Sequence, residues 1–174
     1  MDTIKKLSDY AILTGQSQKF VGVPKTIDND LALTDHTPGY GSAAKYIATS
    51  TKEVIRDGLG FSYKKQQVII IEIMGRNAGW LTGAAALSRG EDCDGPDLIY
   101  LPELTFDIEK FTAKVRKLLT RKDVVVVAVS EGIRIQDGRY VSELGSASDY
   151  VDAFGHKQLT GTASYLANVI HRDI

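Results

Sequence analysis

Two aspartates placed two positions apart are the residues of this sequence best suited to chemistry. Asp28 and Asp30 follow Lys25 and Thr26, and the group comes directly after a short apolar run at residues 20–23. In an extended segment, residues two apart project from the same side. Carboxylates beside a cation and a hydroxyl at the carboxyl end of a strand occupy the usual position of a site in an open α/β sheet. From the spacing alone, the alternative is a polar turn built from ordinary turn residues.

A second polar group begins at Met74, directly after an apolar run at residues 68–73. Its sequence is Met-Gly-Arg-Asn-Ala-Gly-Trp at positions 74–80, and that of the first group is Lys-Thr-Ile-Asp-Asn-Asp at positions 25–30. In this order the two motifs resemble those of the phosphofructokinase family, and the pair is far more specific than either motif alone. The resemblance runs over nearly the whole chain and favours the pyrophosphate-linked branch.

The resemblance implies phosphorylation of the 1-hydroxyl of fructose 6-phosphate to fructose 1,6-bisphosphate in glycolysis. Phosphoryl transfer to a hydroxyl needs a base for the proton, cations on the moving phosphoryl group and in-line positioning. Asp28 matches the family's base, and Asp30 is expected to help hold Mg²⁺, because hard cations prefer carboxylate oxygen. Thr26 is expected to donate a hydrogen bond to the sugar phosphate or to the transferred group. A role confined to the loop is the alternative for each of these residues.

The sugar-phosphate contacts that the resemblance implies come from two other strand ends. Met74 and Gly75 match the sugar-phosphate segment, in which glycine lets the backbone approach a ligand closely. Arg76 can make fork-shaped hydrogen bonds to phosphate oxygens and offset charge in the transition state. Its alternative is a structural ion pair with Glu72. Glu131 matches the family's acceptor for sugar hydroxyls, and its alternative is an exposed glutamate at the end of a strand.

Lys25 bears on the phosphoryl donor. In nucleotide-using members of the family this position is typically glycine, which leaves room for the inner phosphate and the nucleoside. A lysine fills that space and places an ammonium against the end of pyrophosphate, so we expect pyrophosphate as the donor. ATP is the alternative, because some relatives with lysine here use ATP and the second deciding position lies in a glycine-rich loop upstream of Met1.

One position departs from the family. Counting back from Met74, members often have an arginine, contributed across a subunit interface, where this chain has Gln67. Lys64 or Lys65 is the nearest replacement cation. We expect a homo-oligomer for the full-length protein, but the departure argues against a phosphate site shared between subunits in the usual bacterial way.

Composition and charge disfavour several classes of protein. The 174 residues suit one domain, and a formal net charge of −1 favours neither nucleic acid nor an anionic membrane. The apolar runs are far short of a membrane span, and the first residues do not resemble a signal peptide. Cys93 is the only cysteine, so no internal disulfide can form and a cytoplasmic location fits. We therefore expect no nucleic-acid partner and no membrane.

Helical and strand patterns alternate along the chain. Periodicity predicts helices at residues 1–16, 41–57, 80–89, 108–120 and 159–170, and Asp107 is a suitable N-cap for the fourth of them. Apolar runs predict strands at residues 20–23, 68–73, 97–101 and 124–129, and a hairpin at residues 133–141 with Asp137 and Gly138 at its turn. This alternation predicts an α/β fold, three-layered and Rossmann-like, with a mainly parallel sheet and helices on both faces. The fold should be phosphofructokinase-like but incomplete.

Relative to the family, residues 1–174 correspond to the central part of a catalytic region. The parts expected to be missing are the N-terminal loop for the donor phosphate and the C-terminal segment with further residues for the sugar phosphate. We therefore expect the chain alone to be inactive. Two other classes stay open, namely a sugar-phosphate-binding module without turnover and a structural relative that has lost catalysis. The set Thr26, Asp28, Asp30, Arg76 and Glu131 argues against the second.

Overall fold

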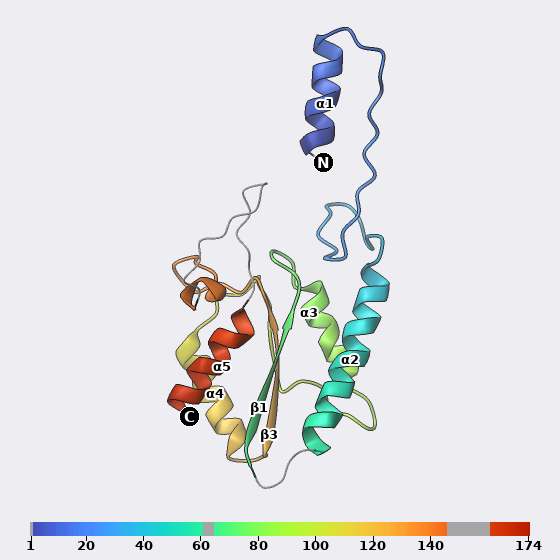
Figure 1. Ribbon diagram of the computed structural model, residues 1–174. Coiled ribbons are helices and arrows are strands. Elements are labelled where there is room, and N and C mark those ends of the chain that lie inside the picture. The colour runs from blue at the N-terminus through green and yellow to red at the C-terminus, as the bar shows by residue number, and fades with distance from the viewer. Residues whose placement is uncertain (1, 61–64, 146–160) are drawn as a thin grey trace.

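A parallel sheet at the centre of the molecule positions the other elements (Figure 1). The structure is a computed structural model and describes residues 2–60, 65–145 and 161–174. Within these residues the sheet has three strands in the order β1-β3-β2, with bounds Gln67–Ile73 for β1, Leu98–Tyr100 for β2 and Val124–Ser130 for β3. Because β1 and β2 both run parallel to β3, the carboxyl ends of all three strands lie at one edge of the sheet.

Helices cover both faces of this sheet (Figure 1). α2 and α3 lie on one face and α4 and α5 on the other, with bounds Tyr40–Gly60, Trp80–Ala84, Ile108–Leu119 and Thr162–Asp173. Successive side chains of β3 alternate between the two cores, as the period of a strand requires. Val125, Val127 and Val129 pack with the core that contains α4 and α5, whereas Val124, Val126 and Ala128 enter the core on the other face. The predicted three-layer α/β architecture is confirmed.

The two long apolar runs form strands that differ in burial. All seven residues of β3 are buried, because the strand lies between two neighbours. β1 is also mainly apolar, with Gln67 and Glu72 as its polar residues, yet Ile73 is its only buried residue. β1 lies at an edge of the described sheet, where its side chains lack a neighbouring strand on one side.

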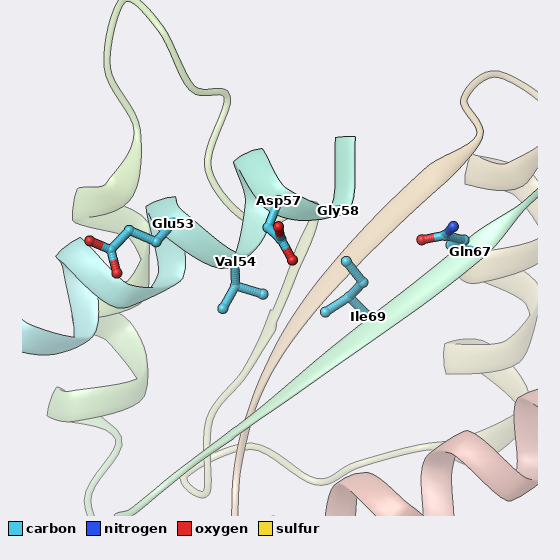
Figure 2. A pocket seen from close by; sticks show the side chains of 6 residues that line it. All are labelled: Glu53, Val54, Asp57, Gly58, Gln67 and Ile69. Atoms are coloured by element: carbon cyan, nitrogen blue, oxygen red, sulfur yellow. The ribbon is translucent and has the colours of Figure 1, made fainter. Parts of the chain in front are cut away.

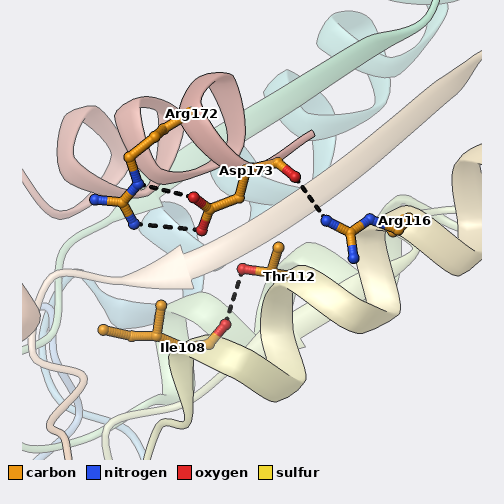
Figure 3. A network of polar contacts seen from close by, with 5 residues as sticks. All are labelled: Ile108, Thr112, Arg116, Arg172 and Asp173. Carbon is orange, nitrogen blue, oxygen red and sulfur yellow. Dashed lines mark hydrogen bonds and ion pairs between the residues drawn. The ribbon is translucent and has the colours of Figure 1, made fainter.

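Polar contacts join α4 to α5 (Figure 3). The Arg116 guanidinium of α4 donates a hydrogen bond to the backbone oxygen of Asp173, at a distance of 2.6 Å. Nε of Arg172 donates to the carboxylate of the same aspartate at 2.7 Å. Within α4, the Thr112 hydroxyl donates to the backbone oxygen of Ile108 at 3.0 Å. The bond from Arg116 thus connects α4 to the last residue of α5, whereas the other two bonds lie within one helix each.

The first part of the chain lies apart from the sheet (Figure 1). α1 spans Asp2–Leu13, as its periodicity predicts, and Gly15 follows with a φ of 67° that suits the end of a helix. The strand predicted at residues 20–23 is wrong. No strand forms there, and Val21 and Val23 are 82% and 83% exposed. An apolar run becomes a strand only where another strand offers hydrogen bonds, and the described residues place none beside this segment.

Several element boundaries also differ from the predictions. The helix predicted at residues 80–89 divides into α3 and a 3₁₀ helix, Ala85–Ser88. The predicted hairpin turn at residues 137–138 is present, but the flanking residues form only an isolated bridge and a second 3₁₀ helix, Val141–Leu144, follows. α4 begins after Asp107, whose carboxylate accepts a hydrogen bond from the backbone N–H of Lys110, which confirms this predicted N-cap. Residues 159 and 160 of the last predicted helix lie outside the described residues.

Within residues 2–60, 65–145 and 161–174, no helix is both long enough and apolar enough to cross a membrane.

Candidate active site

The ends of β1 and β3 bring the two halves of the candidate site together. The two strands pair in register, so that Ile73 lies opposite Ser130. One residue further on, the backbone N–H of Glu131 still donates to the oxygen of Ile73 at 3.0 Å. The backbone N–H of Gly75 then donates to Oε1 of Glu131 at 3.3 Å. Two segments far apart in the sequence, at residues 74–76 and 130–132, therefore form one polar edge.

Two glycines make this close approach of the segments possible. Gly75 has a φ of 138°, a conformation that side chains disfavour, and a Cβ there would lie 2.5 Å from the backbone oxygen of Ala78. A Cβ on Gly132 would lie 2.0 Å from the backbone oxygen of Arg76. The backbone that carries Arg76 thus packs directly against the residue after Glu131, and this contact places the guanidinium and the carboxylate in the same region.

The loop that carries Asp28 is a tight turn. Asn29 has a φ of 57°, so the segment is not extended and the expectation that Asp28 and Asp30 project from one side of an extended strand is wrong. The Asn29 side chain is buried and holds the loop closed. Its amide oxygen accepts a hydrogen bond from the N–H of Thr37 at 2.9 Å, and its amide nitrogen donates to the oxygen of Asp35 at 3.1 Å.

The surroundings of Asp28 suit a group that exchanges a proton. The side chain is half-buried, and its Oδ1 has no hydrogen-bond partner among the residues that the structure describes. Burial raises the pKa of the carboxyl above 3.8, and the neighbouring Asp30 raises it further. Lys25 and Arg76 act in the opposite direction and lower the same pKa. These four residues, predicted to act together, are therefore close enough to influence one another.

Glu131 lies in a similar environment. Burial raises the pKa of its carboxyl above 4.5, while the hydrogen bond from Gly75 and the charge of Arg76 lower it. The negative charges of Asp28 and Glu72 also raise this pKa. Arg76 thus lowers the pKa of both carboxyls, that of Asp28 and that of Glu131.

The remaining predicted residues lie around these groups. Thr26 is half-buried, and its hydroxyl oxygen accepts a hydrogen bond from the N–H of Asp28 at 3.1 Å. This local bond still allows the hydroxyl to donate its proton. Lys25 and Asp30 are exposed. Met74 is 54% exposed and, with Ile27, lines a cavity of about 300 Å³ beside the end of β1.

Carboxylate oxygens at this edge fit the expected Mg²⁺. Asp28 offers a buried oxygen without a partner among the described residues, and Asp30 is its neighbour in the turn. The described residues contain no group of three or more His, Cys, Asp or Glu side chains that could enclose a metal. Mg²⁺ characteristically binds one or two carboxylates and completes its shell with water and substrate phosphate, so two aspartates are sufficient.

Comparisons with known proteins agree with this arrangement. The profile of a family described as Phosphofructokinase matches residues 1–174. The chain belongs to the phosphofructokinase family. A pyrophosphate–fructose 6-phosphate 1-phosphotransferase from Xanthomonas campestris is 46% identical over 173 residues, which are 99% of this chain and 41% of that protein. One from Halomonas elongata is 41% identical over 173 residues, which cover 99% of this chain and 40% of the relative.

The fold is likewise that of solved phosphofructokinases. The crystal structure of a pyrophosphate-dependent phosphofructokinase from Nitrosospira multiformis matches with a TM-score of 0.75 and 34% identity, over 99% of this chain and 39% of that one. The chain therefore spans about two fifths of the length of the curated relatives that it matches. The predicted membership of the family and the predicted fold are both confirmed.

Neither Trp80 nor Gln67 belongs to the polar edge formed by residues 74–76 and 130–132. Trp80 is 57% exposed at the start of α3. Gln67 is the first residue of β1 and lies about 20 Å from the site along the strand. There it lines a groove of about 850 Å³ with Glu53, Val54, Asp57, Gly58 and Ile69 (Figure 2). Lys65 is described and exposed, whereas Lys64 lies outside the described residues.

Sequence reasoning missed two residues that hold the site together. Asn29 was obscured by its position between two aspartates, although its tolerance of a positive φ is a recognisable signal. Ser130 follows a run of valines and is fully buried. Its bonds to both site segments depend on pairing across the sheet, and no sequence signal points to them.

Proposed function

We propose that the protein carrying this chain transfers a phosphoryl group from pyrophosphate to the 1-hydroxyl of fructose 6-phosphate. The observation that carries the proposal is the convergence of a half-buried Asp28, Arg76 and Glu131 at the carboxyl edge of the sheet. The relatives named pyrophosphate–fructose 6-phosphate 1-phosphotransferase support the choice of reaction. The product would be fructose 1,6-bisphosphate, in the direction of glycolysis.

Asp28 is the proposed base. The 1-hydroxyl oxygen attacks the terminal phosphorus of pyrophosphate, the bond from that phosphorus to the bridging oxygen breaks, and orthophosphate leaves. The proton of the hydroxyl passes to the Asp28 carboxylate. A raised pKa suits this role, because a more basic carboxylate accepts a proton more readily, whereas Lys25 and Arg76 oppose the rise in the pKa of Asp28.

Arg76 and Lys25 are the proposed cations for the transferred group. A phosphoryl group in transit spreads negative charge over its three outer oxygens, and fixed positive charges lower the energy of that state. Arg76 is half-buried, so its charge is less screened than that of a surface arginine. Lys25 is exposed and can reach the end of a short donor.

The sugar phosphate is proposed to lie against the segment of Met74, Gly75 and Arg76 and against Glu131, with Thr26 as a further donor. Glu131 presents a carboxylate that can accept hydrogen bonds from sugar hydroxyls. Its position is set by the bond from Gly75, in the segment that also carries Arg76. Mg²⁺ would be held by Asp30 and by the Asp28 oxygen that has no hydrogen-bond partner among the described residues, and it would neutralise phosphate charge when bound.

Residues 1–174 are proposed to form the central part of a larger catalytic region. The two-fifths share of the relatives' length supports this view. The relatives' further residues would include the donor-phosphate loop and a C-terminal segment for the sugar phosphate, so the chain alone is expected to be inactive. We also propose a cytoplasmic location and a homo-oligomeric complete protein. The free, buried Cys93 is consistent with a reducing compartment.

A donor assay on the complete protein tests this function. Fructose 6-phosphate and Mg²⁺ are supplied with either pyrophosphate or ATP, and fructose 1,6-bisphosphate is measured. Turnover with pyrophosphate alone is the expected result. Turnover with ATP alone would show that Lys25 does not exclude a nucleotide, and no turnover with either donor would overturn the enzyme assignment.

Titration of the 174-residue chain with fructose 6-phosphate provides a second, independent readout. Weak binding without turnover is expected. The Arg76→Ala variant removes the proposed phosphate contact, so it should bind fructose 6-phosphate more weakly than the unchanged chain. Equal binding by the chain and by this variant would contradict the proposed sugar-phosphate site.

A further inference from the structure

Ser130 connects the two segments that form the proposed sugar-phosphate site. Its side chain is fully buried at the end of β3. Its hydroxyl donates a hydrogen bond to the backbone oxygen of Gly75 at 2.6 Å and accepts one from the backbone N–H of Gly132 at 3.0 Å. One hydroxyl thus uses both its donor and its acceptor capacity to bridge the end of β1 and the end of β3.

The two backbone partners belong to the residues that place the site side chains. Gly75 accepts from Ser130 through its oxygen and donates through its N–H to the Glu131 carboxylate. Gly132 lies against the backbone of Arg76, so closely that no side chain fits between them. The Ser130 hydroxyl therefore lies at the junction where the positions of Arg76 and Glu131 are set relative to each other.

We propose that Ser130 is a positioning residue for binding of the sugar phosphate. This inference rests on the proposed function and deepens it. The hydroxyl is fully buried and bonded to backbone groups, and it acts by holding the Gly75 peptide in the orientation that allows its N–H to bond Glu131. Without the hydroxyl, the Gly75 oxygen and the Gly132 N–H would lose their shared partner inside the protein, and the two segments would separate or rotate to find others.

The effect of this residue should fall on the sugar phosphate rather than on the donor. The two bonds of Ser130 hold Gly75 and Gly132, and Gly75 in turn bonds Glu131, the proposed contact for the sugar hydroxyls. Lys25, a proposed contact for the donor, belongs to a different segment of the chain, at residues 25–30. Loss of the hydroxyl should also change the acidity of Glu131, because the bond from Gly75 lowers the pKa of that carboxyl.

Steady-state kinetics of the complete protein test the proposal with Ser130→Ala. We expect a rise of about tenfold in KM for fructose 6-phosphate, equal to about 1.4 kcal/mol, and less than a twofold change in KM for pyrophosphate. The acid limb of the pH profile for fructose 6-phosphate binding should move to higher pH. Ser130→Thr keeps the hydroxyl and should restore both properties.

Ser88→Ala is the matched control. Ser88 is also a buried serine, and its hydroxyl donates to the backbone oxygen of Ala85 at 2.7 Å within a 3₁₀ helix outside the site. This variant should leave both KM values and the pH profile unchanged. If Ser130→Ala does not fold, Ser130→Cys, which keeps the size of the side chain, replaces it.

Three results would overturn the inference. An active wild-type protein whose Ser130→Ala variant keeps its KM for fructose 6-phosphate would reject the positioning role alone. Equal changes in both KM values, with an unmoved pH profile, would assign Ser130 a general structural role. An inactive wild-type protein that does not bind fructose 6-phosphate would instead reject the proposed function, and the inference with it.

Discussion

Replacing Gly132 by alanine tests the geometry on which the candidate site depends. A Cβ at this position would lie 2.0 Å from the backbone oxygen of Arg76, 2.6 Å from its carbonyl carbon and 2.8 Å from its Cα. Favourable contacts between carbon atoms begin near 3.5 Å, so the two backbones must separate by about 1 Å or more. All three atoms belong to backbone, and no flexible side chain can give way.

The expected loss of stability is large for a single methyl group. Overpacking in a well-packed region costs about 1–3 kcal/mol, and the absence of a flexible neighbour places Gly132→Ala at about 3 kcal/mol. In a protein of this size, such a loss lowers Tm by about 6–12 °C. Because the strain acts on the backbone of Arg76, binding of fructose 6-phosphate should weaken as well.

Thermal and urea unfolding of the 174-residue chain measure this effect, with Gly83→Ala as the control. Gly83 lies within α3, and a Cβ there would meet no atom within 4 Å. Alanine inside a helix is favoured over glycine by about 0.5–1 kcal/mol, so the control should raise Tm slightly. Equal Tm values for wild type and Gly132→Ala would refute the close approach of the two strand ends.

Two further substitutions separate activity from stability. Asp28→Asn should lower kcat of the complete protein at least about a hundredfold, because it removes the base. Asp28→Asn should also raise Tm at pH 7. The pKa of Asp28 is raised in the folded chain, so ionisation of this carboxyl destabilises the fold as pH rises above 3.8. In a series of melting curves, the higher Tm of the variant should therefore vanish below that pH. Asp97→Ala should cost about 2 kcal/mol in urea unfolding without affecting the site, because Asp97 accepts hydrogen bonds from Lys122 at 2.6 Å and from the Val126 N–H at 2.8 Å. Asp97→Asn, which keeps an acceptor for Val126, should lose less; equal losses would contradict this assignment.

The alternation of apolar runs with helical periodicity was sufficient to predict the class of fold. A run such as Val124–Ser130 is apolar on both faces, and only a strand covered by helices on both sides can bury it. The N-cap at Asp107 was predictable for a similar reason, because a helix start needs a local acceptor. Features determined by neighbours in the sequence, or by period, are accessible without a structure.

Predictions that needed a partner distant in the sequence were less secure. Residues 20–23 are apolar enough for a strand, but the described residues provide no strand beside them, and Val21 and Val23 stay exposed. Trp80 is large and aromatic, yet it lies on the outward side of α3. Hydropathy describes what a residue would gain from burial, whereas the packing of other elements decides whether burial is available.

The same distinction, between what the sequence determines and what the packing decides, holds for the candidate site. The motifs around Asp28 and Arg76 indicated which residues could act, because their sequences resemble the motifs of the phosphofructokinase family. The tertiary structure decided how these groups meet: the register of β1 and β3 sets Gly75 against Glu131, and Ser130 bridges the two strand ends. The pKa of each carboxyl depends in turn on burial and on charges brought from other segments. Groups far apart in the chain come close together in space only when the strands pair. For that reason the chemistry could be named from the sequence but its geometry could not.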